Sequence, residues 1–368
     1  MAGHSNSGVT AICCLLHSLV PGGSTWQWIR LLARHVEHGG RATIVAELGP
    51  LAGPARAAGI EVVPTAWGDN GPRGRTWRKV AEHDVAIIHW EQRVLEVFPR
   101  ALQACGRVAL AVHVAPQTMT RRLAPPTPMR ARRTLERAVA EPHAAVLVRG
   151  DAHRRKVANA YAVPEDALRI LPASIPLPSL PFSPALGDPT EVLAMTRLAP
   201  DKTAIVRAAI ELVRAGLGAD HPCRLTIAGD GPWRPHAIAL CEHHLPRDSW
   251  RIEGAPEDPI ARLAASDLIV AQGTTTLEAA ALGRRVVVAR LLGAHGASGV
   301  VLTPDNYDQA ARDPFGDPPV AEDPAQLWKE LGALDESDLS VLRQLVESHN
   351  SLEVASRALG EALAATEA

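Results

Sequence analysis

Several features are missing from this 368-residue sequence, and each absence excludes a class of protein. Lys and Arg number 38 against 40 Asp and Glu, so the basic excess needed for general nucleic-acid binding is lacking. No run approaches the roughly 18 apolar residues that a membrane-spanning helix needs. Walker, G-x-G-x-x-G, nucleophile-elbow and protease-triad patterns are also absent, which argues against the enzymes that they mark.

Cysteine is scarce and shows no pairing pattern. The chain has five cysteines, an odd number without C-x-x-C spacing, which favours a reducing compartment and hence the cytoplasm. The apolar stretch 9–16 follows no Lys or Arg, so it fits a first strand better than a signal peptide. Neither a D-x-D pair nor His/Cys ligand spacing occurs, and we expect no metal and no resident cofactor.

Short apolar runs predict the fold class. The chain is too long for one ordinary core, so we expect two domains. In both halves apolar runs alternate with helical patterns, which is typical of a parallel sheet covered on both faces. We therefore predict an α/β protein of two Rossmann-like, doubly wound domains. The runs are 9–16, 42–45, 60–63, 85–88, 108–112 and 144–148, then 192–194, 225–228, 251–253, 268–271 and 286–289.

A proline-rich stretch separates the two halves. Residues 171–189 read LPASIPLPSLPFSPALGDP and show neither helical nor alternating periodicity, as expected of a linker. We expect domains at 1–175 and 176–346, with a C-terminal helix at 347–368 that packs back toward the first domain. Because a proline-rich connector limits how two lobes swing, a ligand is expected in a cleft between them.

Gly22 and Gly23 follow the first predicted strand, within HSLVPGGSTWQW. A glycine pair at a strand-to-helix turn lets a ligand approach the backbone closely. It also suits a tight turn that needs positive φ, and the sequence leaves both readings open. Ser24 and Gln27 have the spacing of a capping box for the next helix.

The segment QGTTTLEAAALG, 272–283, follows the apolar run 268–271. Gly273 permits a turn, and the threonines that follow place N–H groups and hydroxyls at a helix N-terminus, which favours an anion such as phosphate. Thr275 and Glu278 equally fit a T-x-x-E capping box, in which the carboxylate only reaches back to the Thr275 N–H. Both readings stay open at this point.

Arg197 and Lys202 lie in TRLAPDKT, 196–203, directly after the first strand of the second half. We expect Pro200 to keep this loop from becoming a helix. An Arg fork and a Lys point charge on one loop can embrace a diphosphate. At an effective dielectric of about 20, one such contact at ~4 Å contributes about 4 kcal/mol before desolvation, against roughly 0.3–1 kcal/mol for a helix dipole. The alternative is a pair of solvated surface charges.

In combination, these segments resemble the C-terminal domain of GT-B glycosyltransferases. The resemblance is strongest to the large retaining family that includes bacterial mannosyl- and glucosyltransferases, family four. It is carried by TRLAPDKT, LTIAGDGPWRP (225–235), IEG (252–254), ASDLIV (265–270) and TTTLEAAALGRRVVV (274–288), in matching order. The N-terminal half matches less specifically, through PGGSTW, HGGRATIV (38–45) and the histidine of ALAVHVAP (109–116).

This resemblance implies a metal-independent enzyme that transfers a sugar from a nucleoside-diphosphate donor held by the second domain to an acceptor held by the first. Arg197 and Lys202 would hold the diphosphate, and Glu278 the ribose of the nucleotide. His113 would face the donor sugar. The other donor-binding positions implied are Gly22, Gly23, Gly229, Gly231, Glu253, Gly273, Thr274, Thr275 and Thr276.

The chain departs from the family pattern at one informative position. Family members carry a glutamate eight residues before the one matched by Glu278, and here that position is Val270. The same segment without this glutamate, in a shortened form, occurs in inverting GT-B enzymes and in nucleotide-sugar 2-epimerases. We therefore expect retention of configuration, with a 2-epimerase or a non-catalytic nucleotide-sugar-binding protein as alternatives.

Two further features bear on the acceptor. His89, Trp90 and Glu91 follow the fourth predicted strand, where either an acceptor pocket or partly buried packing is expected. Arg121–Arg137 contains six arginines and one acid, a pattern that fits weak contact with anionic lipid or a phosphorylated acceptor, or equally the solvated face of an amphipathic helix. The acceptor, a small molecule, a glycan or a lipid-linked group, and the oligomeric state are left open.

Overall fold

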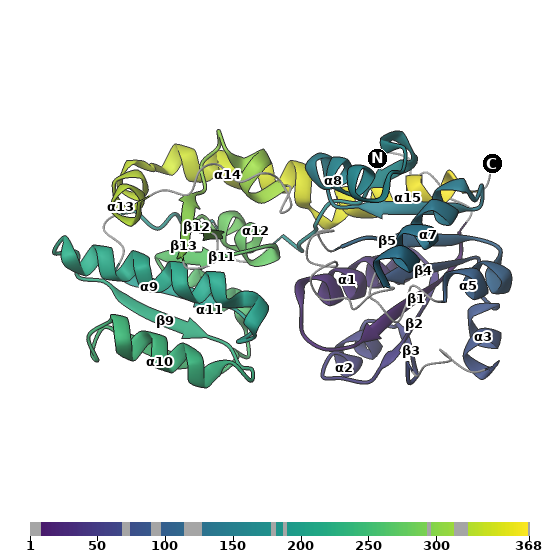
Figure 1. The fold of residues 1–368 in the computed structure, drawn as a ribbon, viewed down its shortest axis with the longest axis horizontal. Helices are drawn as coiled ribbons and strands as arrows, with labels where there is room; N and C mark the ends of the chain where they lie inside the picture. Colours follow the sequence, from purple (N-terminus) through teal and green to yellow (C-terminus); the bar gives the residue numbers. More distant parts are fainter. Residues whose placement is uncertain are drawn as a thin grey trace. The chain divides into compact units, whose positions relative to one another are not determined.

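The computed structural model describes residues 9–67, 74–89, 97–113, 127–177, 182–186, 190–292, 296–312 and 323–366. It divides into two compact units: unit 1 comprises residues 1–174 and 352–368, and unit 2 comprises residues 175–351 (Figure 1). The chain therefore passes between the units twice. The two crossings lie side by side, because Ile175 forms a β-bridge with Ser351 and its N–H donates to the Asn350 carbonyl at 3.0 Å.

Unit 1 contains a seven-stranded sheet in the order β3-β2-β1-β4-β5-β6-β7, and every neighbouring pair of strands is parallel. The order reverses direction between β1 and β4, which makes that boundary the topological switch point. The strands are β1 (Ala11–Ser18), β2 (Arg41–Glu47), β3 (Glu61–Pro64), β4 (Val85–His89), β5 (Val108–Ala111), β6 (Ala144–Val148) and β7 (Leu168–Ile170).

Helices cover both faces of this sheet, because successive side chains of a strand point to opposite faces. Along β1, Cys13 and Leu15 belong to one buried cluster, whereas Ile12 and Cys14 belong to the other. The unit 1 helices are α1 (Gly23–Glu37), α2 (Ala52–Ala57), α3 (Gly74–Val80), α5 (Phe98–Cys105), α7 (Thr127–Ala140), α8 (Asp151–Tyr161), the short 3-10 helix Glu165–Ala167 and α15 (Leu352–Ala364).

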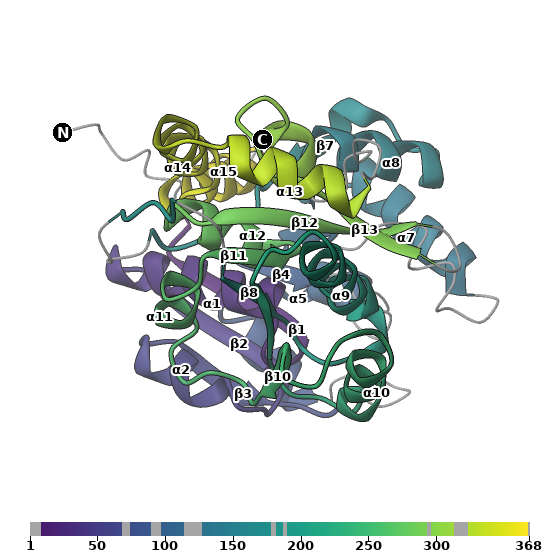
Figure 2. The same ribbon diagram turned by 90° about the vertical axis from the view of Figure 1, so that its left-hand side faces the viewer.

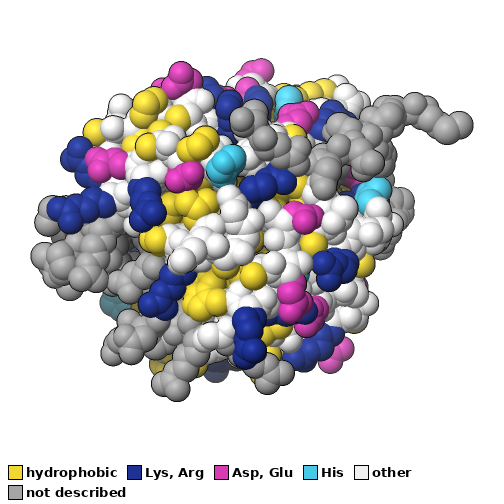
Figure 3. All heavy atoms as spheres, turned by 90° about the vertical axis from the view of Figure 1, so that its right-hand side faces the viewer, with side chains coloured by type: hydrophobic (Ala, Val, Ile, Leu, Met, Phe, Trp, Pro, Cys, Tyr) yellow, Lys and Arg dark blue, Asp and Glu magenta, His cyan; other side chains and the backbone are white. Residues whose placement is uncertain are grey.

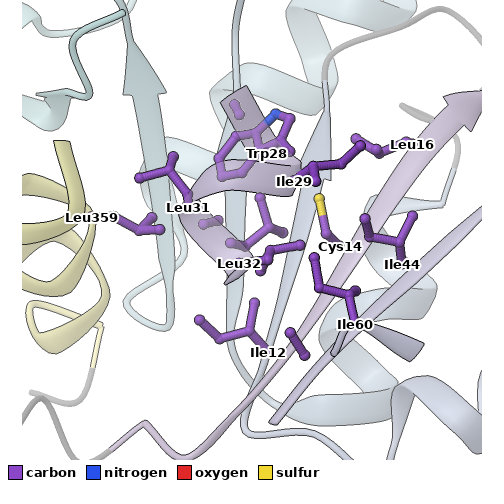
Figure 4. Packing of buried hydrophobic residues seen from close by; sticks show 14 of the residues in the cluster. Ile12, Cys14, Leu16, Trp28, Ile29, Leu31, Leu32, Ile44, Ile60 and Leu359 are labelled. Carbon is purple, nitrogen blue, oxygen red and sulfur yellow. The ribbon is translucent and has the colours of Figure 1, made fainter. Parts of the chain in front are cut away.

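The C-terminal helix α15 belongs to unit 1. Leu359 packs beside Leu31 of α1 in the same buried cluster as Trp28 (Figure 4). The guanidinium of Arg107 ties the end of the helix down by donating to the Leu363 carbonyl at 2.6 Å and to the Thr366 hydroxyl at 3.0 Å. The last helix of the chain thus completes the apolar layer on one face of the first sheet.

Unit 2 contains a six-stranded sheet in the order β10-β9-β8-β11-β12-β13, in which only the pair β12–β13 is antiparallel. Its switch point lies between β8 and β11. The strands are β8 (Glu191–Met195), β9 (Arg224–Ala228), β10 (Trp250–Glu253), β11 (Leu268–Ala271), β12 (Arg285–Leu292) and β13 (Gly296–Val301).

Helices also flank the second sheet on both sides, and Figure 2 shows α9 and α11 on opposite sides of β8 and β11. α9 carries a continuous buried stripe that includes Ile205, Ala209 and Leu212. The helical segments are the 3-10 helix Pro200–Lys202, α9 (Thr203–Gly218), α10 (Arg234–His244), α11 (Pro259–Ala264), α12 (Thr274–Ala281), the π-helix Asp308–Arg312, α13 (Pro324–Ala333) and α14 (Glu336–Asn350).

The described parts of the proline-rich stretch form no helix and no extended strand. One part is anchored to unit 2: the Arg284 guanidinium donates to the Ser183 carbonyl, and the Arg343 guanidinium lies 5.5 Å from the centroid of the Phe182 ring. In the described parts of the chain, no helix combines the length and apolar character needed to cross a membrane.

The predicted fold class is confirmed: both units are doubly wound α/β domains built mainly from parallel strands. Each predicted run coincides with a strand to within a few residues. Two strands at sheet edges were missed. β7 is only three residues long, and β13 contains Gly296 and Gly299, so neither has a marked apolar pattern.

Candidate functional site

In unit 2, the candidate residues gather at the carboxyl edge of the sheet. Arg197 follows β8, Gly229 and Gly231 follow β9, Glu253 ends β10, and Gly273 follows β11. Because β10, β9, β8 and β11 are adjacent and parallel, these positions lie along one edge. The Arg197 loop and the start of α12 flank the switch point, where open α/β sheets bind ligands.

The loop after β8 presents an exposed cation. The Arg197 side chain is 54% exposed, and its Nη2 lies 3.2 and 3.3 Å from the two carboxylate oxygens of Asp201. We predicted that Pro200 keeps this loop from becoming helical, and that prediction is wrong. Pro200 begins a 3-10 turn, because its fixed φ suits a first helical position. Lys202 ends that turn and is the residue just before α9.

Gly229 and Gly231 bring the β9 loop against the backbone of the Arg197 loop. Both have φ of +151°, and a Cβ would lie 1.9 Å from the Thr196 carbonyl oxygen at Gly229 and 2.2 Å from that of Leu198 at Gly231. The two loops are hydrogen-bonded, with the Leu198 N–H donating to the Asp230 carbonyl at 2.9 Å. These glycines therefore place the arginine loop, whatever they do toward a ligand.

Glu253 lies within a network of arginines. Its carboxylate is 3.0 Å from Arg251 Nε and 3.2 Å from Arg262 Nε. Arg234 of α10 holds the end of β10 by donating to the carbonyls of Glu253 and Ile252 at 3.2 and 3.1 Å. The side chain of Glu253 is thus engaged within unit 2, and its backbone carbonyl is held by α10.

The structure excludes one of the two readings of the 272–283 segment, the T-x-x-E capping box. α12 begins at Thr274, and its N-cap is Gly273, which has φ of 67° and no side chain to cap the first turn. Thr275 is therefore inside the helix and cannot be the N-cap of a T-x-x-E capping box. The Thr276 N–H donates to the Gly273 carbonyl at 3.2 Å, whereas its hydroxyl is buried with no hydrogen-bond partner among the described residues. Glu278 is buried at 8% exposure on the same helix.

In unit 1, the glycine pair opens α1 without a strained backbone. Gly22 is the N-cap with φ of −179°, so the tight turn with positive φ is excluded. The nearest atom to a Cβ at Gly22 would be Thr25 Oγ1 at 4.0 Å, which leaves room beside the backbone. The predicted Ser24–Gln27 capping box is absent, because the helix starts at Gly23 and no side chain caps it.

His89 and His113 converge at the carboxyl edge of the first sheet. His89 is the last residue of β4, and His113 follows the neighbouring strand β5. Their rings meet edge to face with centroids 4.9 Å apart, and the His113 ring stacks on Trp28 of α1 at 5.5 Å. Burial, reinforced by the charge of Arg149, holds the pKa of His113 well below 6.5. Both histidines are more than nine-tenths buried.

Arg149 is part of this cluster, and our sequence analysis missed it. It follows β6 directly, is only 6% exposed, and donates from Nη2 to His113 Nδ1 at 3.0 Å and from Nη1 to Gln27 Oε1. Burial lowers its pKa to about 9. The available signal was an arginine at the end of the run 144–148, but in RGDAHRR it looks like the charged start of a surface helix.

The arginine-rich segment is described only in part. Arg121 and Arg122 lie outside the described residues, as do Trp90, Glu91 and the side chain of Arg130. On α7, Arg132 pairs with Glu136 at 2.7 Å, and Ala131 and Leu135 are buried, as in an amphipathic helix with one solvated face. On the face of unit 1 shown in Figure 3, basic and acidic side chains are intermixed.

No group of three or more His, Cys, Asp or Glu side chains is placed to hold a metal ion in the part of the chain that the structure describes.

The fold is found in many solved structures. HepE of Anabaena, crystallised with UDP-glucose, superposes with a TM-score of 0.71 at 15% identity, over 96% of this chain and 99% of its own. A glycosyltransferase of Rickettsia africae gives 0.66 at 14% identity, over 94% and 96%. Sucrose-phosphate synthase of Thermosynechococcus elongatus gives 0.65 at 15% identity, over 96% and 98%.

Sequence comparison adds no relative: no protein-family model matches the chain, and no curated protein matches it. At identities near 15% a structural likeness establishes the fold alone. Over nearly its whole length, the chain has the GT-B fold that our sequence analysis predicted.

Proposed function

We propose that this protein transfers a sugar from a nucleoside-diphosphate sugar to an acceptor, with retention of configuration and without a metal ion. Unit 2 binds the donor and unit 1 binds the acceptor. In this proposal Arg197, Lys202 and the first turn of α12 neutralise the leaving diphosphate, the role that a divalent cation plays in metal-dependent enzymes.

One observation carries the proposal: the Arg197 loop and the N-terminus of α12, whose N-cap is Gly273, follow the neighbouring parallel strands β8 and β11 at the switch point of unit 2. A helix N-terminus presents N–H groups and a partial positive charge, and a glycine N-cap has no side chain that competes with an anion for them. Two cations and a helix terminus at one edge suit a diphosphate better than a neutral ligand.

The ion pair between Arg197 and Asp201 does not prevent this role. An exposed i,i+4 pair contributes only about 0.3–0.5 kcal/mol. The guanidinium has five N–H donors, and both hydrogen bonds to the carboxylate of Asp201 come from Nη2. A diphosphate can therefore bind the remaining donors while Asp201 limits the rotamers of the side chain.

The other roles follow from position. Glu278, on α12, accepts hydrogen bonds from the ribose, and Gly231, Glu253 and their loops line the nucleotide side of the edge. Thr274 and Thr275 offer N–H groups to the distal phosphate. In unit 1, Gly22 and Gly23 approach the donor through their backbone, and the ring of His113 faces the donor sugar.

Two finer points belong to the proposal. The donor nucleotide to test first is UDP, because the HepE structure contains UDP-glucose. The compartment we propose is the cytoplasm, since all five cysteines are free thiols and four of them are buried.

The experiment is a donor–acceptor screen with NMR detection. The protein is incubated with UDP-sugars and with mixed acceptors, in the presence of EDTA, and the anomeric signals are followed. Transfer with the donor configuration retained is expected. Isomerised sugar from donor alone would indicate a 2-epimerase, and donor binding without transfer or hydrolysis would indicate a binding protein; either result contradicts the proposal.

A further inference from the structure

The guanidinium of Arg149 is clamped at the carboxyl edge of the first sheet. Gln27 Oε1 accepts from Nη1, and His113 Nδ1 accepts from Nη2 at 3.0 Å. Gln27 is itself fixed, since its Nε2 donates to the Pro172 carbonyl at 2.9 Å. The Arg149 N–H also donates to His153 Nδ1 at 3.1 Å, which secures the loop that leads into α8. The position of this cation is therefore well defined.

Among the described residues of unit 1, no carboxylate balances the charge of Arg149. Both acceptors of its side chain are neutral groups, and no ion pair with a carboxylate is found for it among the described residues. With a pKa of about 9 it is still protonated at neutral pH. An uncompensated buried charge costs several kcal/mol, so a protein retains one where a ligand supplies the opposite charge.

The same cluster contains a second hydrogen-bond donor, Nε2 of His113. Because an arginine has no acceptor, Nδ1 of His113 must be the unprotonated nitrogen, and the neutral ring then carries its proton on Nε2. His113 is only 8% exposed, and this Nε2 has no hydrogen-bond partner among the described residues. A buried N–H without an acceptor is unfavourable unless a ligand oxygen completes it.

The two groups share one edge with the rest of the unit 1 site. Strands β1, β4, β5 and β6 are adjacent and parallel, and they are followed or ended by Gly22, His89, His113 and Arg149. This edge includes the switch point between β1 and β4. A cation and an N–H donor are thus placed where such sheets bind ligands.

We propose that Arg149 and His113 bind an oxyanion, a phosphate or a carboxylate, and that this group belongs to the acceptor. The assignment to the acceptor rests on the proposed function, in which unit 2 holds the donor diphosphate. The acceptor class is then a phosphorylated or carboxylated sugar or small molecule. Arg149 recognises the charge, and His113 donates from Nε2.

The direct test measures binding of inorganic phosphate and of acetate to the full-length protein by thermal shift, with sodium chloride at matched ionic strength as reference. In Arg149→Met the Kd for these ions is expected to rise at least about 30-fold, the lower end for loss of a partner of a buried charge. If the Met variant does not fold, Arg149→Lys, which keeps the charge, replaces it in the binding measurement. This variant is expected to bind phosphate and acetate more weakly than the wild type.

Arg284→Met is the matched control. Arg284 is also buried, at 8% exposure, but its guanidinium holds backbone carbonyls such as that of Leu282 within unit 2. Its loss is expected to lower the melting temperature and to leave the phosphate shift intact. Absence of a phosphate or acetate shift in the wild type, or an equal loss in both variants, would overturn the site.

UDP separates this inference from the proposed function. The UDP-induced thermal shift is expected to vanish in Lys202→Ala and to persist in Arg149→Met. The phosphate-induced shift is expected to persist in Lys202→Ala and to vanish in Arg149→Met. Loss of UDP binding in Arg149→Met would assign Arg149 to the donor diphosphate and overturn the acceptor reading. If wild type binds phosphate but not UDP, the anion site stands and the donor assignment fails.

With active enzyme, glucose 6-phosphate should be preferred over glucose as acceptor, and the preference should disappear in Arg149→Met.

Discussion

The two sheets present basic side chains at corresponding edges in opposite electrostatic settings. In unit 2, the Arg197 side chain is 54% exposed and has Asp201 beside it. In unit 1, Arg149 is only 6% exposed and contacts neutral acceptors. Water and Asp201 screen the first cation, whereas the second keeps most of its field because its surroundings are poorly polarisable.

This difference teaches how each edge can select a ligand. In the proposed function, the partly exposed pair Arg197 and Lys202 binds a diphosphate by charge and tolerates variation in the rest of the donor. A clamped, buried guanidinium requires the anion to reach one fixed position. The difference in binding free energy between a charged and a neutral ligand is therefore larger there than at the exposed cations. The predictions below test each half of the comparison, from the largest expected effect to the smallest.

The largest effect is expected for Lys202→Ala. Removing a cation that offsets charge on the leaving group should lower kcat by about 10²–10³-fold, as loss of one transition-state donor does. The melting temperature without ligand should change little, because Lys202 is partly exposed and its side chain does not cap α9. Initial rates with UDP-sugar and unfolding curves measure the two quantities. Wild-type turnover in this variant would remove the diphosphate role from unit 2.

Gly229→Ala tests whether the β9 loop places the Arg197 loop. The added Cβ would meet the Thr196 carbonyl oxygen at 1.9 Å, so backbone must move, and we expect a loss of about 1–3 kcal/mol in unfolding free energy with weaker UDP binding. Denaturant titration measures the loss. Gly218→Ala in α9, where no atom lies within 4 Å of the new Cβ, is the control and should be neutral or stabilising.

The histidine cluster predicts a pH dependence of stability. The folded pKa of His113 lies below its ordinary 6.5 because the ring is buried, so the unfolded chain takes up this proton first as pH falls. Stability is therefore complete above about pH 6.5 and decreases below it, by up to about 1.4 kcal/mol per pH unit for one proton.

Urea unfolding of wild type and His113→Gln between pH 7 and 5 measures this slope. His35 and His83 also have lowered pKa values from burial, and they remain in both proteins as a common background. The variant should lose less stability than the wild type over this range. Equal slopes would contradict the assignment of a neutral, buried His113.

The smallest change in stability is expected for Gly22→Ser. Serine is at least as good an N-cap as glycine, and the space beside Gly22 is open, so unfolding free energy should stay equal or rise by a few tenths of a kcal/mol. If the donor approaches this backbone, the Kd for UDP-sugar should nevertheless rise. Unchanged stability together with unchanged donor binding would exclude Gly22 from the site. Titration calorimetry and thermal melts give both values.

Much of the fold was predictable, because a buried parallel strand must be apolar along its whole length. The run 268–271 coincides with β11, and 144–148 with β6. Helix starts were predicted less well. The capping boxes proposed at Ser24 and Thr275 fail because glycine N-caps at Gly22 and Gly273 start both helices earlier, and backbone conformation at a glycine is not visible in a local pattern.

The two edges differ in how much the sequence discloses. Arg197 and Lys202 lie on one short loop, so their proximity is a local property of the chain. Gln27, His113 and Arg149 are separated by 36 to 122 positions, and only the order of parallel strands brings them together.

By itself, the sequence determined the two α/β domains, the strands of their centres and the cationic loop of unit 2, since these depend on hydrophobic periodicity and neighbouring residues. The tertiary structure alone decided that glycines 229 and 231 place an arginine loop and that Arg149 is buried. The reason is physical: burial and pairing of a charge depend on which distant segments pack around it.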